Sequence, residues 1–161
     1  MKYSFPARPG LLAALALAAL VVTPAFAQAQ KAPPSKAERV IKYRQSLLYL
    51  LGWNIGPVAA MVKGEIPFDK DAMVLHADRL AQLAQMIAEG FPADSQSGAP
   101  TKAKPAIWQN KSDFEAKAAE LERVTAKFAT TARSGDPKQI AAGLGEVGGA
   151  CKACHEKYRA D

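Results

Sequence analysis

Two cysteines and a histidine lie close together near the C-terminal end of the sequence. Cys151, Cys154 and His155 form a C-x-x-C-H motif, the attachment site for a c-type haem. In that chemistry each thiol forms a thioether bond with one vinyl group of the haem, and the imidazole binds the iron. On a helix these spacings place all three side chains on one face, as a flat macrocycle requires. The motif therefore predicts one covalently bound haem c with His155 as axial ligand.

Other uses of the cysteine pair fit the sequence less well. A disulfide within one helical turn would be strained. A thioredoxin-like redox pair needs a neighbouring βαβ pattern, and the sequence has no strand pattern. A structural zinc site needs four ligands, whereas the chain has only two cysteines and two histidines, and His76 is distant in sequence. We interpret His76, which falls on an apolar helical stripe, as a half-buried side chain rather than a metal ligand.

Residues 1–27 have the features of a secretory signal peptide. Two basic residues precede a short apolar run at 11–22, and Ala25-Phe26-Ala27 is an A-x-A cleavage site. The alternative is a retained membrane anchor, which the shortness of the apolar run disfavours. We therefore predict that residues 1–27 are removed on export, that residues 28–35 form a flexible leader, and that the mature chain does not bind a membrane.

The charge balance is mildly positive. The chain has 21 basic and 15 acidic residues, and loss of the signal peptide would remove two of the basic ones. No cluster of lysine and arginine with interleaved aromatic residues lies on one face. Nucleic acid is therefore not an expected partner.

Apolar spacing and end signals predict four helices. The first begins at Ser35, which heads a capping box, and ends at Gly64. The second runs from about residue 69 or 71 to Glu89, where Gly90 stops it. A loop rich in glycine, proline and serine follows at 91–105.

The third helix is expected from Ser112, as N-cap, to about Ser134. The fourth begins at Asp136, as N-cap, with Pro137 in its first position. Its apolar stripe continues into the C-x-x-C-H motif, so the haem must face the core. The sequence thus predicts an all-α fold, an antiparallel four-helix bundle over residues 36–161 with covalently bound haem near its C-terminal end.

The fourth helix is rich in glycine and alanine just before the motif. One interpretation is a poor helix that tertiary contacts stabilise, because each glycine costs roughly 0.5–1 kcal/mol. The other is that small residues leave room for a macrocycle and for close helix approach. The clustering of glycines before the attachment site favours the second interpretation.

Three segments resemble motifs of the cytochrome c′ family, and the resemblance covers essentially the whole mature chain. They are residues 42–46 (KYRQS), 104–108 (KPAIW) and 147–159 (VGGACKACHEKYR). A haem motif in the last of four helices is also the reverse of ordinary cytochromes c, which carry it near the N-terminus.

This resemblance implies roles for residues outside the motif. Arg44 and Gln45 would lie at the haem edge, with the guanidinium near a propionate, and Thr101 and Lys102 would touch the same edge. Arg159 would lie beside the proximal face and the imidazole. Without the resemblance, Arg44 would be interpreted as a solvated surface charge.

Leu48 decides the chemistry of the distal face. Low-spin, methionine-ligated relatives carry a methionine at this position, and leucine has no lone pair to donate to iron. The distal pocket should therefore be apolar and unligated, with walls formed by Leu48 and Phe91. Ordinary core packing is the alternative role for Leu48.

These features predict a periplasmic, five-coordinate, high-spin haem protein that binds nitric oxide, and carbon monoxide more weakly. The resemblance implies buffering, carriage or detoxification of nitric oxide. The alternative is a periplasmic electron-transfer cytochrome with a redox partner. An enzyme is not expected, because no distal His/Arg pair accompanies Leu48.

The first helix carries more apolar residues than one buried stripe requires. They are Leu47, Leu48, Leu50, Leu51, Trp53, Ile55 and Val58. The excess predicts a second buried face and hence a homodimer. Alternatively, Leu50 and Trp53 cover the end of the bundle.

Overall fold

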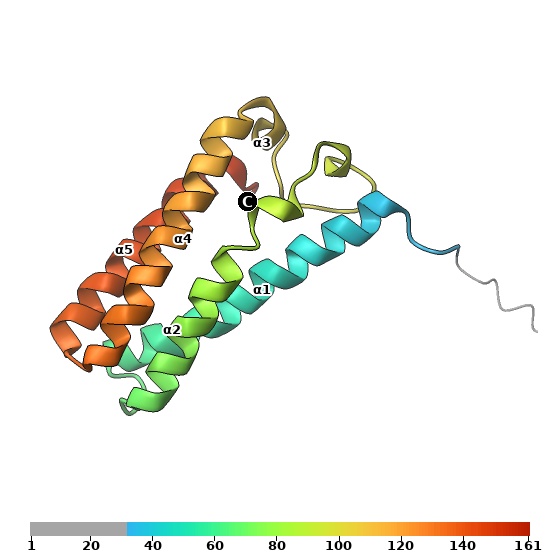
Figure 1. Cartoon of the computed structure of the whole chain (residues 1–161). Coiled ribbons are helices and arrows are strands. Elements are labelled where there is room, and N and C mark those ends of the chain that lie inside the picture. Colours follow the sequence, from blue (N-terminus) through green and yellow to red (C-terminus); the bar gives the residue numbers. More distant parts are fainter. Residues whose placement is uncertain (1–31) are drawn as a thin grey trace, which may run out of the picture. The chain divides into compact units, whose positions relative to one another are not determined.

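Helices form nearly all the regular structure of residues 32–161, the part of the chain described by the computed structural model (Figure 1). In chain order the elements are α1 (Lys36–Lys63), α2 (Lys70–Ala84), the 3₁₀ turns η1 (Ala88–Gly90) and η2 (Ala93–Ser95), α3 (Ala106–Gln109), α4 (Lys111–Ser134) and α5 (Pro137–Tyr158). The predicted all-α helical bundle is confirmed. The expected signal peptide (1–27) and the first half of the expected leader (28–35), residues 28–31, lie outside the described residues.

The bounds predicted for α1 are confirmed. The Ser35 hydroxyl accepts a hydrogen bond from the backbone N–H of Glu38, and the Glu38 carboxylate accepts one from the backbone N–H of Ser35. Gly64 ends the helix with φ of 73°, a left-handed conformation that glycine adopts without steric cost. Helix α1 continues through Pro57.

Helix α2 ends earlier than predicted, at Ala84 rather than Glu89. Beyond it the chain tightens into turns in which backbone N–H groups bond to carbonyls three residues back. These turns bring Gly90 against α1, where a Cβ atom on Gly90 would lie 2.9 Å from the Cβ of Arg44. The close approach buries Ile87 and Phe91, and this tertiary contact overrides the local helical pattern.

The start of α4 also differs from the prediction. Asn110, not Ser112, is the N-cap residue, and Ser112 lies inside the helix. The short helix α3 occupies residues just before it, and the Asn110 side chain donates to the carbonyl of Ala106 in α3. Because α3 brings the chain directly into α4, helical structure begins two residues earlier than the capping pattern indicated.

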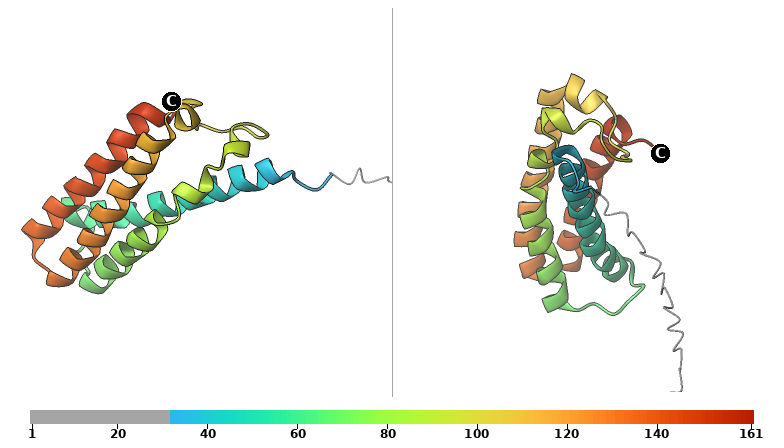
Figure 2. Two further views of the ribbon diagram at one scale, coloured as in Figure 1. Left: turned by 45° about the horizontal axis from the view of Figure 1, so that its top comes forward. Right: turned by 90° about the vertical axis from the view of Figure 1, so that its right-hand side faces the viewer.

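The four long helices pack in an antiparallel arrangement. Helix α4 packs against both α2 and α5, and α1 packs against α2, whereas α1 and α5 make less contact with each other. The N-terminal half of α1 stands away from α4 and α5 (Figures 1 and 2). The core is formed by buried apolar side chains, among them Val58, Met73, Leu80, Phe128, Ile140 and Val147.

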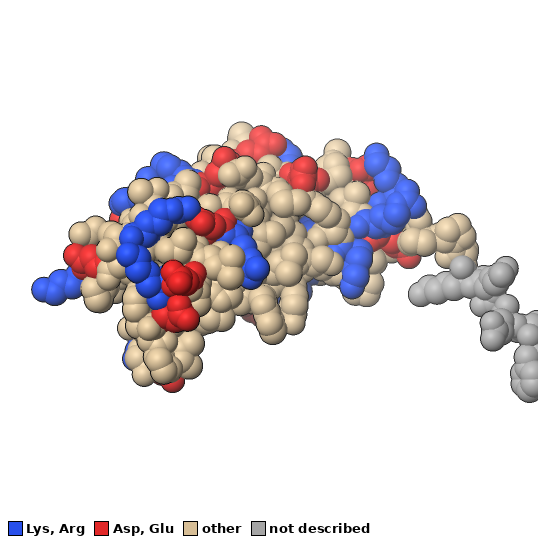
Figure 3. All heavy atoms as spheres, turned by 60° about the horizontal axis from the view of Figure 1, so that its bottom comes forward, with Lys and Arg blue, Asp and Glu red and all other residues tan. Residues whose placement is uncertain are grey.

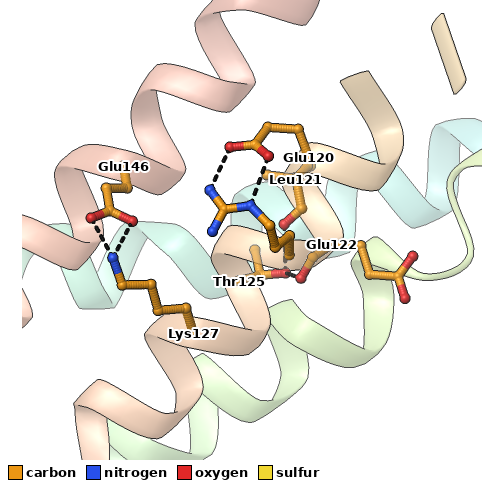
Figure 4. Close-up of polar contacts among 7 residues, drawn as sticks. Glu120, Leu121, Glu122, Thr125, Lys127 and Glu146 are labelled. Atoms are coloured by element: carbon orange, nitrogen blue, oxygen red, sulfur yellow. Dashed lines mark hydrogen bonds and ion pairs between the residues drawn. The ribbon is translucent and has the colours of Figure 1, made fainter. Parts of the chain in front are cut away.

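Charged side chains of both signs are intermixed on the surface (Figure 3). An ion pair between Lys127 and Glu146, 2.7 Å apart, links α4 to α5 (Figure 4). Exposed pairs of this kind contribute little individually. Within residues 32–161, every helix is too short or too polar to cross a membrane.

Asp136 caps α5 as predicted, with Pro137 in the first position. Its carboxylate accepts hydrogen bonds from the backbone N–H groups of Gln139 and Lys138, which hold the pKa of Asp136 below its ordinary value. We therefore expect this cap to weaken in acid.

The lowered pKa of Asp136 makes the stability that this cap contributes depend on pH. A lowered folded-state pKa contributes stability that is complete above the unfolded value, about 3.9, and is lost as the pH falls through the folded value. Asp136→Asn keeps a capping side chain that does not titrate. Thermal unfolding should therefore show a smaller acid-induced drop in midpoint for Asp136→Asn than for the wild type. Equal drops would contradict the prediction.

Candidate haem-binding site

The residues of the C-x-x-C-H motif line a cavity of about 650 Å³. Its walls come from all five α-helices, the segment after α2 and residues 101–103, and most of the lining side chains are apolar. Cys151, Cys154 and His155 all line this cavity from the last two turns of α5. Cavities of this size are typical of sites for small-molecule ligands and cofactors.

The protonation states of these three side chains suit attachment. Both cysteines are free thiols, and burial raises the pKa of each thiol, so the thiols stay protonated. The pKa of His155 is lowered, first by burial and then by the positive charge of Arg159. The imidazole is therefore neutral near pH 7, which is the form that binds a metal ion.

Arg44 lies in the cavity wall and is 2 % exposed. Its guanidinium donates to the backbone carbonyl of Ser95 at 2.9 Å, to the Ser95 hydroxyl at 3.0 Å and to the Thr101 hydroxyl at 3.1 Å. It also lies over the rings of Phe91 and Trp108, 5.1 and 5.5 Å from their centroids. None of the ion pairs within residues 32–161 includes Arg44, so a buried positive charge faces the cavity without a carboxylate partner.

Phe91 and Leu48 are the two residues predicted for the distal pocket. Both line the cavity, but they differ in burial. Phe91 is buried and makes an edge contact with Phe114, at 4.7 Å between ring centroids. Leu48 lines the cavity from α1 but remains 41 % exposed, so it is not part of the packed core. Ordinary core packing therefore does not explain Leu48.

The remaining predicted residues lie along one edge of the cavity. Gln45 donates to the carbonyl of Pro100 at 2.8 Å. Thr101, Lys102 and Arg159 line the cavity from two segments that pair like short strands, with a bridge between Ala103 and Arg159. The cavity thus brings together all ten predicted site residues.

The glycines of α5 serve more than one purpose. A Cβ on Gly143 would lie 2.9 Å from the Phe128 ring, so this glycine permits close packing of α5 on α4. Gly148 lines the cavity, as does Gly52 of α1, and a Cβ on either would meet no atom within 4 Å. Protein packing does not require glycine at these two positions, which leave open the space that a macrocycle would fill.

A family model described as cytochrome c′ matches residues 39–159. The chain belongs to the cytochrome c′ family. It is 39% identical over 128 residues to cytochrome c′ from Cereibacter sphaeroides, which covers 76% of this chain and 84% of the relative.

Solved cytochrome c′ structures match the fold along their full length. Cytochrome c′ from Shewanella frigidimarina has a TM-score of 0.76 at 35% identity, covering 80% of this chain and 100% of that one. A nitric oxide complex of a mutant cytochrome c′ from Alcaligenes xylosoxidans has a TM-score of 0.73 at 30% identity, with the same coverage. A cytochrome c′ with an unusual ligand-controlled dimer dissociation has a TM-score of 0.73 at 28% identity, again covering 80% and 100%.

Cytochromes c′ are non-enzymatic haem proteins that carry covalent haem c, and this chain shares both properties. The residues that line the cavity fit a covalently bound haem. Two thiols and a neutral imidazole line one cavity, two glycines leave space within it, and a buried cation faces it.

Sequence reasoning gave no site role to several cavity residues. Leu51 and Ile55 lie three and seven positions after Leu48 on α1. This spacing places them on the same helix face as Leu48. Tyr158, which follows His155 by three residues on α5, also lines the cavity. His76 does not line the cavity, and its Nδ1 lies 2.9 Å from the Asn54 side-chain oxygen, between α2 and α1.

Proposed function

We propose that this chain is a periplasmic haem protein that binds nitric oxide, and carbon monoxide more weakly, on the haem face opposite His155. Haem held by Cys151 and Cys154 in this cavity would supply an iron atom that the His155 imidazole would bind. The observation that carries the proposal is the apolar lining from α1, namely Leu48, Leu51, Gly52 and Ile55. Among the described residues of the lining, no methionine occurs and His155 is the one histidine.

An apolar wall selects among ligands. Nitric oxide and carbon monoxide are neutral and enter without losing strong hydration, whereas an anion would lose it. Leucine and isoleucine offer no hydrogen-bond donor to stabilise a polar bound oxygen molecule. The solved nitric oxide complex of a relative supports the choice of ligand. Buffering or detoxification of nitric oxide is the corresponding biological role.

The cavity edge would hold the haem propionates. The Arg44 guanidinium, buried without a carboxylate partner, is complementary to one propionate, and Gln45, Thr101 and Lys102 complete this edge. Arg159 lies on the His155 side, where its charge acts on the imidazole. A charge-assisted bond from the propionate would compensate the cost of burying Arg44.

Absorption spectra of the purified protein test the proposal. High-spin ferric and ferrous spectra, and a new spectrum on addition of nitric oxide, are the expected results. Low-spin spectra in both oxidation states would overturn it. They would favour the second candidate, an electron-transfer cytochrome, for which exposed Lys102 and Arg159 at the cavity would provide a docking edge.

The periplasmic location is supported by the family, whose members are typically periplasmic.

We also propose that α1 forms a homodimer interface. Tyr49, Leu50 and Trp53 are 67, 44 and 63 % exposed, so they do not cover the end of the bundle. The rings of Tyr49 and Trp53 stack, with centroids 6.4 Å apart, in a rigid aromatic pair suited to an interface. The relative that shows dimer dissociation supports this assembly.

Trp53→Glu should shift the protein toward monomers. Loss of a central aromatic anchor costs about 2 kcal/mol or more, which corresponds to a roughly 30-fold weaker dimer. Sedimentation velocity over a range of concentrations measures the change. Leu75→Glu, at an exposed apolar position on α2, is the control and should leave the dimer intact. A wild-type monomer at tens of micromolar would contradict the assignment.

A further inference from the structure

One carboxylate at the start of α4 binds two consecutive residues at the end of α5. Asp113 lies in the first turn of α4, and its Oδ2 accepts hydrogen bonds from the Tyr158 hydroxyl at 2.5 Å and from the Lys157 ammonium at 2.9 Å. The two helices are antiparallel neighbours, so the first turn of one meets the last turn of the other. The contact therefore links α4 to the turn that carries His155.

The Tyr158 side chain makes this link rigid. It is 2 % exposed, lines the cavity, and packs edge-on against Phe114 with ring centroids 5.5 Å apart. Burial and the Asp113 carboxylate raise the pKa of Tyr158, so the hydroxyl remains a donor. Tyr158 follows His155 by three residues and stands one turn away.

The end of α5 needs such support. The last carbonyls of a helix have no intrahelical partner, and the glycines at 145, 148 and 149 weaken the preceding turns. After His155 the backbone is held by hydrogen bonds from Lys104 N to the Tyr158 carbonyl and from Ala160 N to the Lys102 carbonyl. These bonds hold the chain from the loop side, and Asp113 holds it from the α4 side.

We propose that Asp113 is a positioning residue for the axial ligand: through Tyr158 and Lys157 it fixes the last turn of α5 and thereby the orientation of the His155 imidazole in the cavity. This rests on the proposed role of His155. The alternative is a surface ion pair with no influence beyond stability. Asp78 and Arg133 provide the comparison, because this pair also links two helices, at 2.8 Å and with similar exposure. Asp113 also bonds to Tyr158, which lines the cavity, whereas the hydrogen bonds of Asp78 and Arg133 reach no cavity residue.

Resonance Raman spectroscopy of the ferrous holoprotein measures the iron–imidazole stretching band directly. We expect Asp113→Asn and Tyr158→Phe each to shift and broaden this band, because the imidazole then samples more orientations. Asp113→Glu, which keeps a carboxylate within reach of the same donors, should restore a narrow band. Asp78→Asn removes a comparable ion pair and should leave the band unchanged.

The outcomes separate this inference from the proposed function. If His155→Ala leaves the wild-type band intact, the ligand assignment itself is wrong. If His155→Ala abolishes the band while Asp113→Asn and Tyr158→Phe leave it unchanged, His155 is the ligand and Asp113 does not position it. A shift of equal size in Asp78→Asn would also overturn the inference, because the effect would then reflect stability alone.

Discussion

Leu48→Ala is expected to raise the affinity for carbon monoxide and nitric oxide and to speed their association. Leu48 lines the cavity from α1, whereas His155 lines it from α5. With haem in the cavity, the Leu48 side chain would pack against it on the side opposite His155. An entering ligand must then displace packed hydrocarbon, at a cost of about 1–3 kcal/mol. Removing that cost corresponds to an affinity gain of roughly five- to 150-fold.

Carbon monoxide titration and flash photolysis of the ferrous protein measure this change. Leu75→Ala is the control, because Leu75 is similarly exposed, at 47 % against 41 %, but lies on α2 and does not line the cavity. Its carbon monoxide affinity should equal that of the wild type. An unchanged affinity in Leu48→Ala would mean that Leu48 does not restrict the distal side.

Leu48→Met tests the same position in the opposite direction. A methionine there brings a thioether sulfur to the distal side, and a Met/His pair is an established axial set for haem iron. The spectrum should therefore change from high-spin to six-coordinate low-spin, and the affinity for carbon monoxide should fall. A spectrum that stays high-spin would place residue 48 too far from the iron to act as a gate.

Local patterns predicted the parts of this fold that depend on local interactions. The caps at Ser35, Gly64 and Asp136 each involve hydrogen bonds or a backbone conformation within a few residues, and all three are confirmed. The predicted end of α2 was wrong because the true end depends on a tertiary contact, the approach of Gly90 to Arg44 of α1. No pattern within a sequence window encodes such a contact.

The candidate site was likewise predicted only where it depends on local sequence or on family resemblance. The spacing of the C-x-x-C-H motif is local, and family resemblance indicated Arg44 and Leu48. The partners of Arg44 are Ser95 and Thr101, which lie 51 and 57 residues further along the chain. The partner of Tyr158 is Asp113, at a separation of 45 residues. These side chains meet only because the helices pack, so the support around the motif could not be derived before the fold was known.

Gly148 offers a test of how closely the haem fits the cavity. It lies three residues before Cys151 and lines the cavity, and a Cβ at this position would meet no atom within 4 Å. The first atom of a side chain at this position therefore meets no clash with the polypeptide. Because leucine is a better helix former than glycine, it should stabilise α5 by roughly 0.8 kcal/mol.

The same side chain would project into the space that the haem occupies. Gly148→Leu should therefore lose most of its covalent haem, measured as haem per polypeptide by absorbance and by haem staining after denaturing electrophoresis. Gly145→Leu is the control, since a Cβ at this position also would meet no atom within 4 Å but Gly145 does not line the cavity. It should gain the same helix stability and keep its haem. If both variants retain full haem, the ring does not fill the cavity beside Gly148. If both lose it, the defect lies in α5 as a helix rather than in the space that glycine leaves open.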